Sequence, residues 1–270
     1  MLFRSVPVHN IQLVSVLRKD LDGFALEKFT QLGGICFDGI SIRDIDSRRH
    51  VATGIGKDRT RREFSFDAVV MADGALSHGR QVVAGQKPDA VLSLEAEVTA
   101  TGAPLLMKYT EELWGYYWYI PAGNVAKIGC VSYGEGRDLE TSLSRFASSL
   151  GIAMSRVRGA FIPTGGSVLL KHKDAYFLGD AAGLICPPSG EGIYYALKSA
   201  RMAAQALANA ANYEALMARD AKVVEREYRT RQLFFNRKFM DSALAAAEKT
   251  PYGSERAVKF ALRHFCSFDA

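Results

Sequence analysis

Two short segments in the second half of the chain combine residue types that suit the binding of a flat or phosphorylated ligand. Residues 176–183 read YFLGDAAG, an apolar strand pattern that ends in small residues around one carboxylate, Asp180. Residues 187–193 read PPSGEGI and open an alanine-rich helical pattern. Small residues let a ligand approach the backbone, and free amides at a helix start attract negative charge. We therefore predict a ligand site here, with Asp180 accepting hydrogen bonds from ribose-like hydroxyls. The alternative is an ordinary β–loop–α junction in which Asp180 is only a turn or cap residue.

The elements around this junction are predicted from hydrophobic periodicity and from glycine and proline positions. An amphipathic helix is predicted over 22–32, with apolar positions Phe24, Leu26, Phe29 and Leu32 and a stop at Gly33-Gly34. Asp67–Met71 is continuously apolar at its centre, as in a strand buried on both faces. Further strands are predicted over 11–17, 40–45, 51–53, 63–66, 90–99, 105–109, 115–120, 125–133 and 175–178. Further helices are predicted over 138–150 and from about Glu191 to about Leu216.

This order of elements predicts a mixed α/β (α+β) fold with a discontinuous ligand-binding domain. Two units in which a strand runs into a glycine-containing loop, at 67–75 and 175–183, flank an inserted sheet. We place the first domain at 1–84 and 165–215, the inserted sheet domain at 85–164, and C-terminal helices at 216–270.

Composition restricts the function classes. The chain has 270 residues, 48% of them hydrophobic, and a formal charge of +5. Its short basic runs are not interleaved with aromatic residues, which argues against nucleic acid as a partner. The four cysteines show no metal-binding spacing, and no apolar run approaches the ~20 residues of a membrane span. We therefore expect a soluble, cytoplasmic protein without a metal site, and leave peripheral membrane association open because the net charge suits an anionic lipid surface.

Several motifs together resemble the geranylgeranyl reductase family of FAD-dependent oxidoreductases, within the para-hydroxybenzoate hydroxylase-like group. The segment from Gly179 through GEGIYYAL (190–197) resembles the family's second flavin fingerprint. VVMADGALS (69–77), with Arg80 nearby, resembles its strand–ADG–Ser element, and YYWYIP (116–121) its Tyr-x-Trp-x-Phe-Pro motif. Arg18 with Leu21-Asp22 resembles its Arg-x-x-Phe-Asp segment. The chain departs from the usual pattern at Ile120, where Phe is usual, at Leu21, also a Phe position, and at Leu113, where Pro is often seen.

The resemblance implies an FAD that lies along the discontinuous domain, with its isoalloxazine ring facing the inserted sheet. Asp180 and Gly179 would lie near the ribityl and pyrophosphate, and loop 187–192 beside the ring. The implied cofactor-binding residues are Arg18, Asp73, Gly74, Gly179, Asp180, Ala181, Pro187, Gly190, Glu191, Gly192 and Ile193. The implied substrate-facing residues are Tyr116, Trp118 and Pro121. An aromatic stripe in a sheet core is the alternative interpretation of Tyr116 and Trp118.

One expected element has no match in the sequence. Such enzymes begin with a βαβ unit that carries Gly-x-Gly-x-x-Gly and an acidic residue about 20 positions later. Gly54-Ile55-Gly56 lacks the third glycine and lies in a predicted hairpin, and Gly33-Gly34 ends a helix. We therefore expect an incomplete Rossmann-like domain without its first βαβ, from a truncated frame, a gene fragment or a separately encoded half. The chain alone is then expected to bind FAD weakly or not at all.

Three functions follow from these patterns. The first is an FAD-dependent oxidoreductase that reduces C=C bonds of an isoprenoid or other lipid-like substrate, with NADPH or a ferredoxin-type donor as reductant. The second is a flavin-dependent monooxygenase or halogenase, and the third a non-catalytic remnant or lipid-binding module. No side chain is predicted to be catalytic, since the flavin itself supplies the hydride chemistry.

Overall fold

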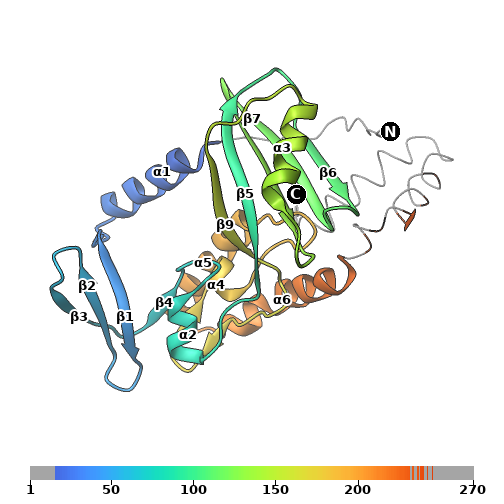
Figure 1. Cartoon of the computed structure of the whole chain (residues 1–270). Coiled ribbons are helices and arrows are strands. Elements are labelled where there is room, and N and C mark those ends of the chain that lie inside the picture. The colour runs from blue at the N-terminus through green and yellow to red at the C-terminus, as the bar shows by residue number, and fades with distance from the viewer. Residues whose placement is uncertain are drawn as a thin grey trace.

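The computed structural model (Figure 1) describes residues 16–231 and, beyond them, only positions 233, 236, 238, 239, 242 and 245. Most of the strand predicted over 11–17 therefore lies outside the described residues. So does most of the predicted C-terminal helical region beyond 231. None of the described helices is long and apolar enough to cross a membrane.

A five-stranded antiparallel sheet is built from one uninterrupted stretch of chain. Its strands lie in the order β6-β7-β8-β5-β9. They are β5 (Ala90–Thr99), β6 (Leu106–Thr110), β7 (Gly115–Ala122), β8 (Val125–Ser132) and β9 (Val157–Pro163). Helix α3 (Leu139–Ser149) covers one face, and its Leu143 and Phe146 are buried there. The four strands predicted in this region and the helix are confirmed, whereas β9 was not predicted.

A smaller sheet joins segments from either side of the inserted one, in the order β10-β11-β4. Strand β11 (Ala175–Phe177) pairs in parallel with β4 (Val69–Met71), so that Met71 lies opposite Phe177. The two-residue strand β10 (Lys171–His172) pairs antiparallel with β11. The parallel pairing produces the interleaved arrangement expected from the sequence, while the exact domain boundaries stay a prediction.

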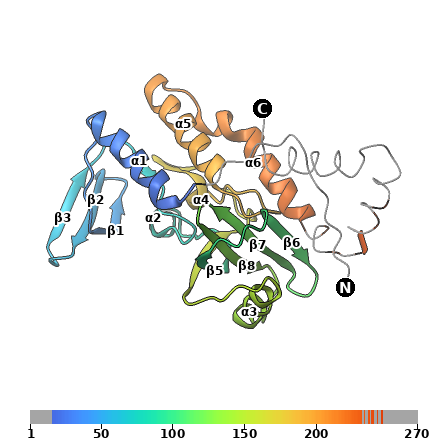
Figure 2. The same cartoon turned by 90° about the horizontal axis from the view of Figure 1, so that it is seen from above.

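Helices α4 (Gly179–Ala182), α5 (Ile193–Asn209) and α6 (Tyr213–Thr230) pack with the smaller sheet. Figure 2 shows the five-stranded sheet between these helices and α3. Phe177, Tyr195 and Met217 are among the most deeply buried side chains of this core. The helix predicted to run to about Leu216 is in fact two helices. Ala210 adopts a left-handed conformation with φ 50°, and the Asn212 side chain caps α6. A left-handed residue commonly ends a helix, and an asparagine commonly caps the start of the next one. The asparagine at 212 was a signal for this break that the prediction overlooked.

Strands β1 (Ile40–Asp46), β2 (Val51–Gly56) and β3 (Arg61–Ser65) form an antiparallel meander at one end of the molecule (Figure 1). The predicted hairpin is present, but Gly54 and Gly56 lie in strand β2, which extends beyond the predicted 51–53 to Gly56. Helix α1 (Arg18–Gln31) precedes the meander and ends before Gly33, whose φ is 88°. The helix is confirmed, but none of its residues is buried. Phe24 and Leu26 are two positions apart and so point to different faces, which is why the expected apolar face does not form.

One burial prediction was wrong. Val70 in the centre of β4 is 40% exposed, although the run around it was expected to be buried on both faces. Within the described residues β4 is an edge strand of its sheet, so one side of it has no neighbouring strand. The short helix α2 (His78–Ala84), which follows β4, was not predicted.

Candidate functional site

Asp180 lies where α4 meets the start of α5. Gly192 is the N-cap residue of α5 and provides no side-chain cap. A Cβ placed on Gly192 would lie 2.7 Å from Asp180 Oδ1, so the carboxylate sits over the first turn of this 17-residue helix. Burial raises the pKa of Asp180, and the positive charge of Arg18 opposes that shift. Asp180 is therefore a partly buried acceptor beside the amino terminus of a helix, and its contact with a ligand stays a prediction.

Gly179 lets α4 pack closely against α5. Its φ is 47°, and a Cβ placed there would lie 3.0 Å from the Cβ of Ala196. Its amide donates to the Ser199 hydroxyl at 3.0 Å. Ala181 is fully buried in the same core and contributes its carbonyl rather than its side chain to polar contacts. The close packing of α4 against α5 therefore explains a glycine at position 179, independently of any ligand.

The Asp73 carboxylate holds the turn that begins α2. Its Oδ1 accepts from the Ser77 hydroxyl at 2.5 Å, and its Oδ2 accepts from the Gly79 amide at 2.7 Å. Ser77 in turn accepts from the Arg80 amide as the N-cap of α2. Gly74 has φ 84°, which favours glycine at this turn. In this structure Asp73 and Gly74 shape the loop after β4.

Arg80, which lies close to the 69–77 motif in sequence, links the loop after β4 to the segment that contains Asp180. Its guanidinium is 0% exposed and donates to the Ser167 hydroxyl at 2.7 Å, the Ser167 carbonyl at 3.1 Å and the Ala181 carbonyl at 3.3 Å. Its Nε has no hydrogen-bond partner among the described residues. Burial lowers the pKa of Arg80, with Asp89 acting in the opposite direction. Arg80 therefore links α2 to α4 through the Ala181 carbonyl and to the segment around Ser167.

Residues 184–189 form a loop that is buried although it has no regular structure. It is closed by the Cys186 amide, which donates to the Glu191 carbonyl at 2.9 Å, and the Gly190 amide, which donates to the Cys186 carbonyl at 2.8 Å. Pro187 is buried within it, whereas Glu191 and Ile193 are exposed at its end. The cofactor residues predicted over 187–193 thus lie together immediately before α5.

The aromatic residues of β7 alternate between the two faces of the five-stranded sheet. Tyr117 and Tyr119 are buried on the face of α3, while Tyr116 and Trp118 pack together on the opposite face. The Tyr116 and Trp118 ring centroids are 5.8 Å apart. Strand alternation places Pro121 on the side of Tyr117, so the structure does not bring it to Tyr116 and Trp118. Tyr116 is buried and Trp118 is partly buried on this face, and a contact of either residue with substrate stays a prediction.

Two tyrosines connect this aromatic face to the loop before α5. The Tyr116 hydroxyl donates to the Ser189 carbonyl. The Tyr133 hydroxyl, directly after β8, donates to the Pro187 carbonyl at 3.0 Å. Burial raises the pKa of both hydroxyls well above the ordinary tyrosine value. Tyr133 was not singled out from the sequence. It lies two positions beyond Val131, the residue paired with Tyr116, and this period of two was the available signal.

Arg18 is brought into electrostatic range of Asp180 from the start of α1. Its guanidinium donates to both carboxylate oxygens of Asp22 at 3.2 Å. Burial raises the pKa of Asp180, and the Arg18 charge partly offsets this rise. The predicted cofactor residues thus divide into two sets. Gly179, Asp180, Ala181 and residues 187–193 lie in α4 or immediately before α5, with Arg18 in electrostatic range of Asp180, whereas Asp73 and Gly74 shape the turn after β4.

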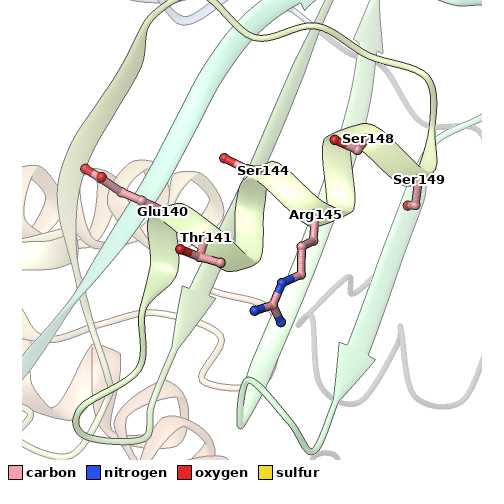
Figure 3. Close-up of a pocket in the computed structure, with 6 residues that line it drawn as sticks. All are labelled: Glu140, Thr141, Ser144, Arg145, Ser148 and Ser149. Carbon is pink, nitrogen blue, oxygen red and sulfur yellow. The ribbon is translucent and has the colours of Figure 1, made fainter.

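A hollow on the outer surface of α3 is separate from this site (Figure 3). Its lining consists of Glu140, Thr141, Ser144, Arg145, Ser148 and Ser149, all on the exposed side of that helix. The hollow is open to solvent and lies across the sheet from the loop before α5. It has no part in the site described above.

Several solved structures with the same fold are flavin-dependent proteins. The chain matches a flavoprotein/dehydrogenase from Cytophaga hutchinsonii with a TM-score of 0.67 and 14% identity, over 94% of this chain and 69% of that one. A variant of Klebsiella pneumoniae HpxO complexed with FAD matches with a TM-score of 0.62 and 14% identity, over 93% and 74%. PqsL, a probable FAD-dependent monooxygenase from Pseudomonas aeruginosa, matches with a TM-score of 0.61 and 19% identity, over 84% and 72%. The fold class is therefore that of the FAD-dependent oxidoreductases.

Proteins that are similar in sequence indicate a narrower group within the FAD-dependent oxidoreductases. The chain is 30% identical to geranylgeranyl diphosphate reductase of Rhodobacter capsulatus over 236 residues, which cover 76% of this chain and 56% of the relative. It is 26% identical to the chloroplastic enzyme of Arabidopsis thaliana over 218 residues, covering 71% and 46%. No protein-family model matches the chain. The chain is thus geranylgeranyl reductase-like, as its motifs indicated, and spans about half the length of these curated relatives.

Proposed function

We propose that this chain holds FAD at the start of α5 and belongs to an oxidoreductase that reduces a C=C bond of an isoprenoid or other lipid-like substrate. The observation that carries the proposal is the position of Asp180, a partly buried carboxylate over a helix start that no side chain caps. The sequence relationship to geranylgeranyl diphosphate reductases supports the substrate class.

The residues present fit the cofactor. Asp180 accepts hydrogen bonds from hydroxyls, and glycine at 192 lets this carboxylate lie against the start of α5, in the space that a side chain would fill. The first-turn amides of α5 favour a neighbouring negative charge. The Arg18 guanidinium adds positive charge close to Asp180. FAD, when bound, supplies the hydride chemistry, while these residues orient it and set its electrostatic surroundings.

The substrate is expected on the aromatic face of the five-stranded sheet. Trp118 and Tyr109, both partly buried and packed against the buried Tyr116, form an apolar surface there, next to the loop before α5. An elongated hydrocarbon chain suits such a surface because its burial needs no polar partners. NADPH or a ferredoxin-type donor is the proposed reductant, in the cytoplasm, with a membrane face as the source of a lipid substrate.

Flavin binding by an Asp180→Asn variant tests the proposal. Fluorescence quenching of FAD measures the dissociation constant, and absorbance at roughly 450 nm after gel filtration shows retention. We expect weak binding by the parent chain and about tenfold weaker binding by the variant, which weakens one charge-assisted acceptor. Asp174→Asn is the matched control, because Asp174 is exposed in the turn before β11. Equal affinity of the Asp180→Asn variant and the parent would refute the assignment.

A flavin-dependent monooxygenase is the second candidate function, favoured by the fold shared with PqsL. It predicts oxygen insertion into a substrate when NADPH and O₂ are supplied, whereas alkene reduction proceeds anaerobically. A non-catalytic, lipid-binding role is the third candidate. It predicts that the parent chain binds an isoprenoid lipid but causes no quenching at any FAD concentration.

A further inference from the structure

The buried loop before α5 has backbone carbonyls that accept hydrogen bonds from two tyrosine hydroxyls. Leu184, Ile185 and Cys186 are at most 1% exposed, and Ser189 is 7% exposed. Buried carbonyls of a loop need donors, because no neighbouring strand or helix turn supplies them. Pro187 and Pro188 have no N–H and so offer no donors within the loop. The Ser189 and Gly190 amides donate to the Cys186 carbonyl, so the carbonyls of Pro187 and Ser189 need donors from elsewhere in the chain.

Both donors come from the inserted sheet, at the ends of neighbouring strands. The Tyr133 hydroxyl lies 3.0 Å from the Pro187 carbonyl, and the Tyr116 hydroxyl donates to the Ser189 carbonyl. The Tyr133 ring also packs against the Arg231 guanidinium at 5.3 Å, after the end of α6. The two tyrosines thus connect the inserted sheet to the loop at alternate carbonyls.

The loop sequence is adapted to this contact at Gly190. Its φ is 72°, a conformation that favours glycine. A Cβ placed there would overlap the Tyr116 hydroxyl and lie 3.2 Å from Ile162 Cδ1. Glycine is therefore required twice at this position, by the backbone conformation and by the approach of Tyr116.

We propose that Tyr116 and Tyr133 are positioning residues that hold the 186–192 loop against the inserted sheet. Tyr116 then acts on the loop rather than by touching substrate, since it is 3% exposed and its hydroxyl is already engaged. Trp118, which is only partly buried, is left as the aromatic residue of the motif that faces substrate. The consequence for catalysis rests on the proposed function, because it assumes that this loop borders the flavin. The contacts themselves need no cofactor.

Amide hydrogen exchange of the full chain without FAD tests the contacts directly. The reporter is a peptide covering 186–193, whose Ser189 and Gly190 amides donate to the Cys186 carbonyl. We expect Tyr116→Phe and Tyr133→Phe each to speed exchange there by about tenfold, because a buried carbonyl loses its donor. Tyr119→Phe is the matched control. Its hydroxyl is buried on the opposite face of β7 and accepts from the Thr101 amide at 2.9 Å, so loop exchange should not change.

Unchanged loop exchange in both Tyr116→Phe and Tyr133→Phe overturns the proposal. So does a Tyr116→Phe protein that shows parental exchange but a raised KM for an isoprenoid substrate, since that result identifies a substrate contact. If Tyr116→Phe does not fold, Tyr133→Phe decides alone, because its ring contact with Arg231 is kept. A failure of FAD binding in the parent chain leaves the exchange result intact, so the two proposals fail separately.

Discussion

A single buried carboxyl should make the stability of this protein fall as pH rises. Glu227 on α6 is 0% exposed, and neither of its side-chain oxygens has a hydrogen-bond partner among the described residues. Burial raises its pKa from 4.5 to about 8, against a smaller opposing effect of the Arg226 charge. The folded state thus keeps a proton that the unfolded state releases above pH 4.5.

The sign and size of the effect follow from proton linkage. Between pH 4.5 and about 8 the folded state binds more protons than the unfolded state. The contribution of Glu227 to the free energy of unfolding is therefore fully present below pH 4.5 and is lost as pH rises to about 8. A difference of about 3.5 between the two pKa values corresponds to an upper value of about 5 kcal/mol at about 1.4 kcal/mol per unit. Local relaxation and water penetration reduce this, and we expect a loss of about 2–3 kcal/mol between pH 5 and pH 8.

Replacing Glu227 by Gln keeps the volume and removes the titration. We expect Glu227→Gln to match the parent within about 1 kcal/mol at pH 5 and to exceed its stability by about 2–3 kcal/mol at pH 8. Urea unfolding followed by far-UV circular dichroism at pH 5, 6.5 and 8 measures both curves. Glu225→Gln, at an exposed position on the same helix, is the control and should keep the parental slope. Parallel curves for the parent and Glu227→Gln would refute the reasoning, because they would mean that Glu227 ionises alike in both states.

Two further substitutions test the packing that supports the site. Arg80→Met should lower the free energy of unfolding by about 2–3 kcal/mol, because the Ser167 and Ala181 carbonyls lose a buried donor; a urea-derived change below about 0.5 kcal/mol contradicts this. Gly179→Ala should cost about 1–2 kcal/mol for its positive φ and more for its contact with Ala196. Gly123→Ala, with φ 64° and nothing within 4 Å of the added Cβ, gives the backbone cost alone. Equal thermal destabilisation of the two glycine variants would mean that the α4–α5 contact is unimportant.

Local signals predicted the inserted sheet well because its strands are adjacent in sequence and alternate between two faces. The predicted strand over 90–99 matches β5, and the helix over 138–150 matches α3 with Asp138 as its cap. Strand β9 was missed because it carries five exposed residues and lacks an apolar alternation. Val70 was misjudged because a run of apolar residues shows that a strand is hydrophobic, not how many strands flank it.

Part of the candidate site could be predicted because its residues lie close together in the sequence. Gly179, Asp180 and the 187–193 segment follow one another along the chain, so their motif already specifies a strand, a turn and a helix start. The position of Arg18 near Asp180 depends on where α1 lies, and only the motif resemblance indicated that Arg18 belongs to the site. The roles of Arg80 and Tyr133 were not predicted. Both depend on contacts between distant segments, which the spacing of residues in one segment does not encode.

The loop before α5 connects the two parts of the protein that a reaction would have to coordinate. On one side it leads into the helix whose start lies under Asp180. On the other side its carbonyls receive Tyr116 and Tyr133 from the sheet that carries Trp118. A shift of the inserted sheet therefore has to move the loop or break these two hydrogen bonds. Since buried hydrogen bonds are costly to leave unmade, the sheet, the loop and the start of α5 should move as one unit, which keeps the proposed substrate face and the proposed cofactor position in a fixed relative position.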